Sequence, residues 1–342
     1  EGYLKATTIP EEADAFLIAV PTPFKPCETG DIPEPNLAYI ESAATAIAPI
    51  LKKGDLVILE STSPVGATEQ MAEWLAEARC DLSFPQQVGE VADVNVAHCP
   101  ERVLPGHVVR ELVENDRVIG GMTAKCSERA IELYKTFVEG DCFTTNARTA
   151  EMAKLTENSC RDVQIAFANE LSIICDNLDI DVWELISLAN RHPRINILQP
   201  GPGVGGHCIA VDPWFIVSKT PEQAKLIHTA RKVNDAKPEW VIKKVKLAVL
   251  DFLQANPTRI VKDVTVACYG LAFKPNIDDL RESPAFEITK TLANELVCNV
   301  VAIEPNITNF ESGNIRLISL QEGKDIADIS IILVNHKEFD IL

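Results

Sequence analysis

Short apolar runs that alternate with helical patterns constrain the fold of this chain most. Strand-like runs lie at 15–20, 55–60, 94–97, 117–120 and 142–145, with helical patterns at 40–51, 67–78 and 126–137. This alternation predicts a parallel, doubly wound α/β sheet, whose ligands bind at the carboxyl ends of the strands. The pattern returns late in the chain, with strands at 263–269, 300–304 and 328–334 and a helix at 284–296. The sequence therefore predicts two α/β domains.

Helical segments fill the region between these two domains. We predict helices at 149–178, 182–190, 221–233 and 237–253, followed by a boundary at Asn256–Pro257. A chain of 342 residues is also too long for one ordinary core. We therefore expect domains at residues 1–147, 148–236 and 237–342.

Composition and charge exclude several classes of protein. A net charge of −18 argues against nucleic acid and anionic membrane surfaces as main partners. The 46% hydrophobic and 24% charged residues are typical of a soluble globular protein, and no apolar run is long enough to span a bilayer. The ten cysteines form no C-x-x-C pair, which indicates reduced thiols and neither a disulfide scaffold nor a zinc site. We expect a cytoplasmic protein without a metal.

The glycine-rich segment Gly201–Pro213 is the strongest candidate for a functional loop. Four glycines in six residues let the backbone approach a ligand closely, and Cys208 follows them with Asp212 four residues later. The segment satisfies G-x-G-x-x-G, but it lacks the preceding strand and the helix that a dinucleotide fingerprint requires. Spacing alone leaves Cys208 as either a structural cysteine in a turn or a thiolate nucleophile.

Polar side chains on the first long helix form a second candidate group. Lys154, Asn158 and Arg161 are spaced i, i+4 and i+7, so they share one face of an otherwise apolar helix. A solvated polar face is the alternative explanation.

Loop residues at predicted strand ends form a third group. Thr22 and Thr62 follow the first two strands, where a loop or capping hydroxyl is the simpler interpretation. Lys274 and Arg281 follow the strand at 263–269, and both are suited to binding phosphates.

Six motifs, taken in order, resemble those of the UDP-glucose/GDP-mannose dehydrogenase family over essentially the whole chain. They are Val20–Pro23, Ser61–Gly66, Pro100–Glu101, Lys154 with Asn158, Gly203–Cys208 with Asp212, and Gly270–Lys274 through Arg281–Pro284. The resemblance implies two Rossmann-like doubly wound domains joined by a helical dimerisation region. It also implies that the primary alcohol at C6 of a sugar is oxidised to a carboxylate by two successive reductions of NAD⁺.

Some motifs resemble those of family members that oxidise UDP-N-acetyl-D-mannosamine. These are Pro100–Gly106, Gly205–Pro213 and Asn190–Arg194. Val103–Pro105 and Val211 replace a Phe-Leu-Arg-Glu run and a lysine typical of UDP-glucose enzymes, so an acidic residue often invoked as an extra base is missing. The implied product is a uronate for bacterial surface polysaccharide, such as enterobacterial common antigen or capsule.

Other functions stay open at this point. UDP-N-acetylglucosamine is an alternative substrate, because it differs from the mannosamine sugar at a single centre. A non-catalytic fragment that binds a UDP-sugar is an alternative from another class. A cysteine hydrolase is disfavoured, because His207 is adjacent to Cys208 and is not placed as its base.

The resemblance further implies roles for individual residues. Cys208 would be the nucleophile, Lys154 and Asn158 would stabilise oxyanions, and Asp212, Thr62 and Glu101 would assist with water and protons. The UDP-sugar would contact Arg102, Val103, Lys154, Asn158, Arg161, His192, Arg194, Gly205, Phe273 and Lys274. NAD would contact Thr22, Thr62 and Arg281. The counterpart of Arg194 reaches the site of a neighbouring subunit, which implies a homodimer.

Both ends of the chain differ from the family pattern. Relatives begin with a strand and a glycine-rich turn that binds the NAD pyrophosphate at a helix N-terminus, whereas this chain opens with Glu1–Ala6. The last strands of the UDP-binding domain are also missing. We therefore expect a chain truncated at both ends, with weakened binding of NAD.

Overall fold

The computed structural model describes residues 4–26, 28, 30–103, 108–307 and 315–339. The opening residues 1–3, Cys27 and the motif residues 104–106 therefore lie outside the described part. The chain divides into two compact units. The first unit comprises Glu1–Asn158 and Asp212–Ala224, and the second comprises Ser159–Val211 and Lys225–Leu342. Each unit is described by itself below.

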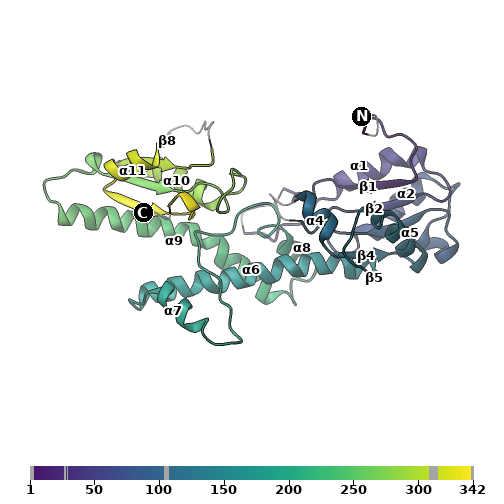
Figure 1. Cartoon of the computed structure of the whole chain (residues 1–342), viewed down its shortest axis with the longest axis horizontal. Coiled ribbons are helices and arrows are strands. Elements are labelled where there is room, and N and C mark those ends of the chain that lie inside the picture. Colours follow the sequence, from purple (N-terminus) through teal and green to yellow (C-terminus); the bar gives the residue numbers. More distant parts are fainter. Residues whose placement is uncertain (1–3, 27, 29, 104–107, 308–314, 340–342) are drawn as a thin grey trace. The chain divides into compact units, whose positions relative to one another are not determined.

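The first unit contains a five-stranded sheet in the order β1-β2-β3-β4-β5 (Figure 1). The strands are β1 (Ala15–Ile18), β2 (Leu56–Leu59), β3 (Asn95–His98), β4 (Arg117–Gly121) and β5 (Cys142–Asn146). All five were predicted, and neighbouring pairs are parallel with the exception of β3 and β4, which are antiparallel. The prediction of a wholly parallel sheet is wrong at that pair. Antiparallel neighbours need no crossover connection, so β4 begins at the edge of the sheet where β3 ends.

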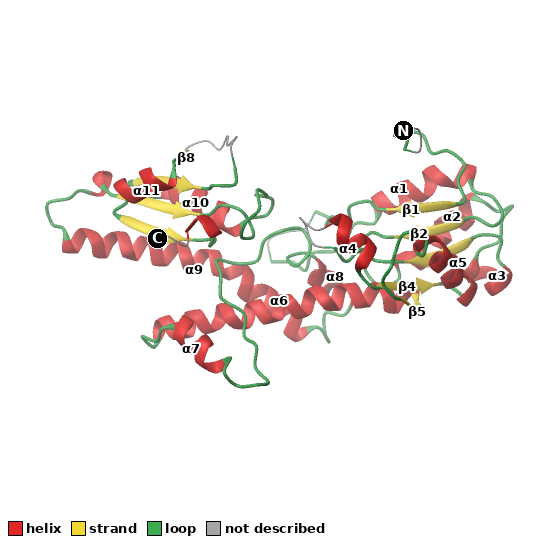
Figure 2. Ribbon diagram, in the orientation of Figure 1, coloured by secondary structure: helices red, strands yellow, loops and turns green. Residues whose placement is uncertain are grey.

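Alternation along β2 shows why this sheet has helices on both faces. Val57 and Leu59 pack in one cluster with residues of α1 (Ala38–Ile47) and α2 (Ala67–Ala78). Leu56 and Ile58 point to the opposite face and pack against α5 (Ala124–Tyr134). Both faces of this strand are buried, which explains its continuous apolar run. The doubly wound α/β architecture is thereby confirmed (Figure 2).

Three shorter helices complete the described part of the first unit, and none of them was predicted. α3 (Pro85–Val88) precedes β3, and α4 (Val108–Glu114) precedes β4. α8 (Asp212–Lys219) directly follows the glycine-rich loop and begins at Asp212.

Long helices dominate the start of the second unit. α6 (Ala147–Asn177) begins in the first unit and continues into the second, and α7 (Val182–Ala189) follows it, both close to the predicted bounds. Residues 225–255 form one continuous helix, α9 (Lys225–Ala255), where two helices were predicted. Pro238 lies inside α9 and removes one backbone hydrogen bond. Asn234 and Lys237 are buried beside it, so tertiary packing overrides the local preference of proline to end a helix.

The second sheet has four parallel strands in the order β8-β7-β6-β9. They are β6 (Thr265–Tyr269), β7 (Asn299–Ile303), β8 (Arg316–Leu317) and β9 (Ile329–Ile332). Val266 and Cys268 pack with residues of α9 and α10 (Pro284–Glu295), while Ala267 and Tyr269 face a second cluster that includes Phe339. α11 (Leu320–Ile326) precedes β9. The second predicted α/β domain is also confirmed.

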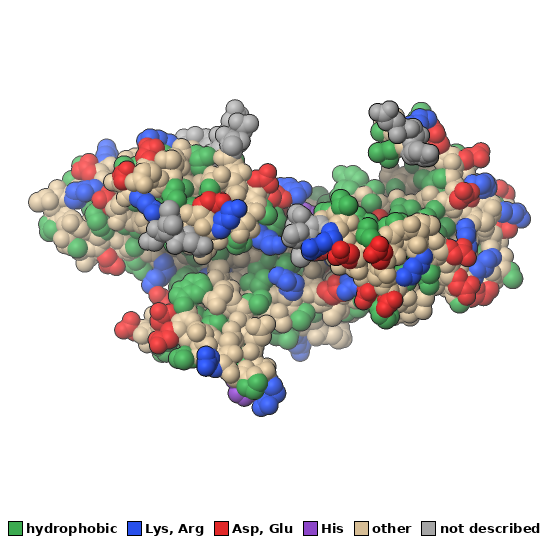
Figure 3. Space-filling view, viewed as in Figure 1, with side chains coloured by type: hydrophobic (Ala, Val, Ile, Leu, Met, Phe, Trp, Pro, Cys, Tyr) green, Lys and Arg blue, Asp and Glu red, His purple; other side chains and the backbone are tan. Residues whose placement is uncertain are grey.

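Over the described ranges, we find no helix with the length and apolar character needed to cross a bilayer. On the face shown in Figure 3, acidic and basic side chains are intermixed over the first unit.

Candidate active site

A buried carboxylate and two polar residues of α6 form the centre of the candidate site in the first unit. The side-chain amide of Asn158 donates a hydrogen bond of 2.5 Å to Oδ2 of Asp212. Burial raises the pKa of Asp212 to about 6, although the hydrogen bond from Asn158 and the positive charge of Lys154 oppose the increase. A carboxylate that titrates near neutral pH is suited to act as a general base.

Local sequence explains how Asp212 reaches this position. Asp212 and Pro213 open α8, where an acidic residue and a proline in the first turn are both favourable. Phe215 of this helix packs edge-to-face against Phe24, with ring centroids 5.9 Å apart, next to the loop that carries Thr22. The Asp-Pro pair is the signal that would have predicted α8.

The loops after β1 and β2 are joined through Ser61. Its Oγ accepts a hydrogen bond of 2.7 Å from the backbone N–H of Val20, so the loops that carry Thr22 and Thr62 are held together. The hydroxyl oxygen of Thr22 is buried and has no hydrogen-bond partner within the described ranges. An unsatisfied hydroxyl at the carboxyl edge of a parallel sheet fits a site where a cofactor supplies the missing partner.

The loop after β3 is held by a buried arginine of β4. Oε1 of Glu101 accepts a hydrogen bond from the backbone N–H of Arg102 at 2.5 Å, and Oε2 accepts one from Nη1 of Arg117 at 3.1 Å. The guanidinium of Arg117 lies 5.4 Å from the ring centroid of Tyr134. Arg102 pairs with Glu157 of α6 at 2.7 Å. Both carboxylate oxygens of Glu101 are therefore engaged within the protein. Val103, the third predicted residue of this loop, is half-buried.

The glycine-rich loop in the second unit packs tightly against the segment 273–284. A Cβ at Gly205 would lie 2.5 Å from the carbonyl oxygen of Glu282 and 2.8 Å from Cβ of Phe273, so only glycine fits there. Gly206 has a φ of +78°, which also favours glycine. The described residues 190–200 before this loop form no strand, in agreement with the expectation that the loop is not a dinucleotide fingerprint. Cys208 is exposed just after this tightly packed stretch.

Arg281 lies near Cys208 in the second unit. The guanidinium of Arg281 donates a hydrogen bond to the carboxylate of Asp279, which raises the pKa of Arg281, with a smaller electrostatic contribution from Cys208. The sequence predicted Arg281 as an NAD contact, and in the structure Arg281 also lies within electrostatic range of Cys208. Lys274 is exposed in the same segment.

The other predicted substrate contacts of the second unit lie at the surface. Arg161 is exposed on α6, and His192 and Arg194 are exposed in the turn after α7. The backbone N–H of Arg194 donates to Nδ1 of His192 at 3.4 Å.

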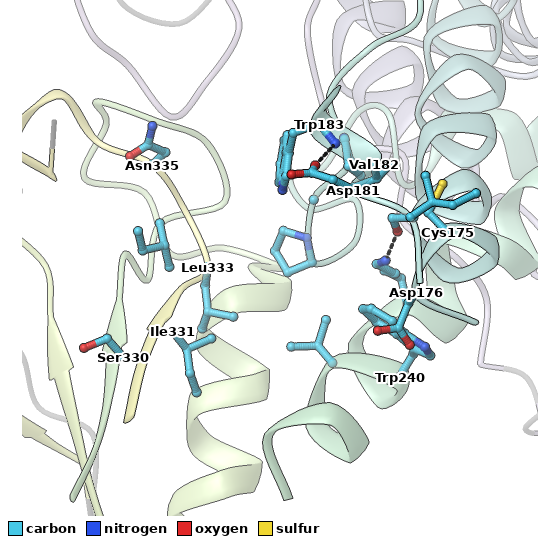
Figure 4. Close-up of a pocket in the computed structure, with 18 of the residues that line it drawn as sticks. Cys175, Asp176, Asp181, Val182, Trp183, Trp240, Ser330, Ile331, Leu333 and Asn335 are labelled. Carbon is cyan, nitrogen blue, oxygen red and sulfur yellow. Dashed lines mark hydrogen bonds between the residues drawn. The ribbon is translucent and has the colours of Figure 1, made fainter. Parts of the chain in front are cut away.

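A cavity of about 1200 Å³ in the second unit is separate from the predicted site residues (Figure 4). Trp183 of α7 and Asp181, which directly precedes this helix, line one side, and Ile331 and Leu333 line another. Lys237 also borders it, and burial lowers the pKa of this amine to about 8. None of the residues predicted to bind substrate or cofactor lines this cavity.

No cluster of three or more His, Cys, Asp or Glu side chains suited to hold a metal ion occurs in the part of the chain that the structure describes.

Comparison with known proteins finds three domain models of one family along this chain. Residues 1–138, 148–236 and 267–342 match the NAD binding, central and UDP binding domains of the UDP-glucose/GDP-mannose dehydrogenase family. The UDP-N-acetyl-D-mannosamine dehydrogenase of Campylobacter jejuni is 65% identical over 99% of this chain and 81% of its own length. The NDP-N-acetyl-D-galactosaminuronic acid dehydrogenase of Ralstonia nicotianae is 62% identical over 99% of this chain and 77% of its own. The structure of the UDP-N-acetyl-mannosamine dehydrogenase Cap5O from S. aureus superposes with a TM-score of 0.81 at 41% identity, covering 100% of this chain and 76% of that one.

Proposed function

This chain belongs to the UDP-glucose/GDP-mannose dehydrogenase family of NAD-dependent enzymes, and from that membership we propose that it oxidises C6 of UDP-N-acetyl-D-mannosamine to the carboxylate. The 65% identity to the C. jejuni enzyme over nearly the whole chain supports UDP-N-acetyl-D-mannosamine as the substrate. We assign NAD to residues 1–147, the subunit contact to residues 148–236 and the UDP moiety to residues 237–342. The uronate would then serve surface polysaccharide synthesis from the cytoplasm.

The cofactor fits the first unit through the loops after β1 and β2. When bound, NAD⁺ accepts a hydride in each of the two oxidations. We assign the unsatisfied hydroxyl of Thr22 and the half-buried Thr62 to hold it. Arg281 keeps its predicted cofactor role as a proposal, and its exposed guanidinium is suited to a phosphate.

Asp212, Asn158 and Lys154 supply the acid–base and electrostatic functions. The ammonium of Lys154 and the amide of Asn158 are hydrogen-bond donors, and they would stabilise an oxyanion at C6 of the sugar. Asp212, with a pKa of about 6, would take a proton from the water that hydrolyses the acylated enzyme. The hydroxyl of Thr62 would help to hold that water.

Cys208 would carry the sugar covalently during the second oxidation. Its thiolate adds to the C6 aldehyde, forming a C–S bond while the carbonyl electron pair moves to oxygen. Loss of a hydride from this thiohemiacetal gives a thioester. Water then adds to the carbonyl carbon and the C–S bond breaks, which releases the carboxylate and restores the thiol.

The remaining predicted residues would bind the UDP-sugar. Because both oxygens of Glu101 are engaged, we assign this residue to holding its loop in place and not to proton transfer. The contacts would come from Arg102, Val103, Arg161, His192, Gly205, Phe273 and Lys274. The exposed guanidinium of Arg194 would reach the active site of a second subunit in a homodimer.

The substrate can be tested directly with a panel of sugars. NADH formation and the uronate product are measured with UDP-N-acetyl-D-mannosamine and with the corresponding glucosamine and galactosamine. The galactosamine sugar is included because the Ralstonia relative is nearly as similar. We expect two NADH for each uronate, with the highest kcat/KM for the mannosamine sugar. Preference for another sugar would overturn the choice of substrate, and no NADH with any of them would overturn the proposed activity.

A further inference from the structure

We propose that Asn169 is a positioning residue for Cys208, because its buried side chain fixes the first glycine of the loop that carries the cysteine. The proposal rests on the role proposed above for Cys208 as nucleophile. Asn169 lies on α6 and is bonded to Asn234 of α9, and both side chains are buried. The loop, Asn169 and Asn234 all belong to the second unit.

A directional chain of hydrogen bonds leads to the loop. Nδ2 of Asn234 donates to the carboxylate and carbonyl oxygens of Asp162, at 2.8 and 3.0 Å. Oδ1 of Asn234 accepts a hydrogen bond of 2.9 Å from Nδ2 of Asn169, and Oδ1 of Asn169 accepts one of 2.9 Å from the backbone N–H of Gly201. Arg231 pairs with Asp162 at 2.6 Å at the far end.

Acceptors at Asp162 determine how each amide is oriented. A carboxylate paired with arginine offers only acceptors, so Asn234 presents its NH2 group to it and its oxygen to Asn169. Asn169 then presents its own NH2 group to Asn234 and its oxygen to the loop. An acceptor therefore always faces Gly201.

Gly201 depends on this hydrogen bond, because among the described residues neither its neighbours nor packing supply another anchor. Pro200 and Pro202 have no backbone N–H, so Gly201 carries the single main-chain donor of these three residues. A Cβ at Gly201 would find its nearest neighbour 4.0 Å away, and the residue borders the cavity of Figure 4. Asn169 is thus the group that holds this end of the loop.

Packing holds the loop farther along. A Cβ at Gly203 would lie 3.1 Å from Pro284, and one at Gly205 would lie 2.5 Å from the oxygen of Glu282. Release at Gly201 would let the loop slide against these contacts and carry Cys208 with it. A misplacement of about 1 Å at a reacting group costs on the order of 100-fold in rate.

The two oxidations differ in their need for Cys208, and this difference distinguishes misplacement of the cysteine from a general loss of stability. The first oxidation acts on an alcohol and needs no thiolate, whereas the second passes through the sulfur of Cys208. Loosening the loop should therefore slow uronate formation more than aldehyde formation.

The experiment removes the hydrogen bond from either side. Asn169→Ala deletes the acceptor on α6, and Gly201→Pro deletes the donor on the loop. Gly201→Ala is the matched loop control, because it keeps the N–H and has space for the methyl group. Ser172→Ala is the control on α6, since it removes a different buried polar group, a hydroxyl that donates to the backbone carbonyl of Asn169 and accepts from Lys237.

Two readouts are compared with wild type. One is the rate at which iodoacetamide alkylates Cys208 at pH 7, in protein without substrate or cofactor. The other is the ratio of uronate to aldehyde, with hydroxylamine present to trap the aldehyde. In Asn169→Ala and Gly201→Pro we expect the alkylation rate to change, and the ratio to fall, by about tenfold. Both controls should stay within about twofold.

Three outcomes would overturn either the anchoring role of Asn169 or the covalent role of Cys208. Wild-type alkylation and product ratio in Gly201→Pro would overturn the proposal even if Asn169→Ala does not fold. An equal effect in Gly201→Ala would also overturn it, because that variant keeps the hydrogen bond. Uronate formation by Cys208→Ala would instead refute the covalent route of the proposed function, while alkylation of the other variants would still test the anchor.

Discussion

The side-chain amide of Asn158 donates a 2.5 Å hydrogen bond to the carboxylate of Asp212, which lies 54 residues later in the chain. Both residues are buried. Because burial outweighs the hydrogen bond and the charge of Lys154, the pKa of Asp212 rises to about 6. A carboxylate in this range can exchange protons near neutral pH, and its ionisation also affects stability.

We expect Asp212→Asn to stabilise the folded protein more at pH 8 than at pH 5. The folded-state pKa of about 6 is above the ordinary value of 3.8, so the folded state binds the proton more tightly than the unfolded state. The stability contributed by this group is therefore fully present below pH 3.8 and is lost as pH rises through 6. A shift of this size corresponds to roughly 3 kcal/mol, and asparagine keeps an oxygen for Asn158. Urea unfolding of both proteins at the two pH values measures the difference. An equal change in the free energy of unfolding at pH 5 and pH 8 would contradict the raised pKa of Asp212.

Glu151→Gln should destabilise the first unit. Glu151 lies on α6, and its carboxylate accepts hydrogen bonds from the N–H of Gly66 at 2.6 Å and from the N–H and hydroxyl of Thr68 at 2.8 and 2.6 Å. It therefore caps the start of α2, and glutamine offers only one acceptor oxygen. We expect a loss of about 1–3 kcal/mol in the free energy of unfolding. Glu170→Gln, at an exposed position of the same helix, is the control and should change it by less than about 0.5 kcal/mol. Equal effects of the two changes would show that the cap contributes nothing.

Cys208→Ala should abolish uronate formation while binding of the UDP-sugar persists. The alanine removes the only sulfur that the proposed route uses and leaves the glycines that pack the loop. Uronate is measured by chromatography and binding by calorimetry. Cys160→Ala, at another exposed cysteine of the second unit, is the control and should keep wild-type turnover. Near wild-type turnover by Cys208→Ala would refute the covalent route.

Mixing Arg194→Ala with Cys208→Ala tests whether the active site is shared between subunits. Cys208→Ala alone should form no uronate, and Arg194→Ala alone should lose most activity at low substrate concentration, because loss of a charge-assisted contact weakens substrate binding about tenfold or more. If Arg194 reaches the partner's site, a mixed dimer has one site with both changes and one with neither, and activity returns to a fraction of wild type. If both residues serve the same subunit, every site keeps one change. No recovery, with subunit exchange confirmed by differently tagged chains, would rule out the shared site.

Local patterns were enough to predict most elements of the fold. The bounds of α2 match the predicted 67–78, and each predicted strand lies within one or two residues of an observed one. Apolar runs and their turn residues act over a few positions, so the sequence expresses them directly. Prediction failed at Pro238, where packing around buried Asn234 and Lys237 keeps α9 continuous. It also missed α8, whose eight residues are too few for a clear periodicity.

The sequence by itself determined the candidate catalytic groups of this protein, since Cys208, Lys154 and Asp212 are recognisable from their motifs. Only the tertiary structure decided the state and surroundings of those groups. Asp212 acquires its raised pKa from burial, Glu101 is engaged by Arg117, and Gly201 is held by Asn169 from 32 residues away. A side chain becomes buried and gains hydrogen-bond partners when segments distant in sequence pack together, so residue spacing along the chain does not predict either property.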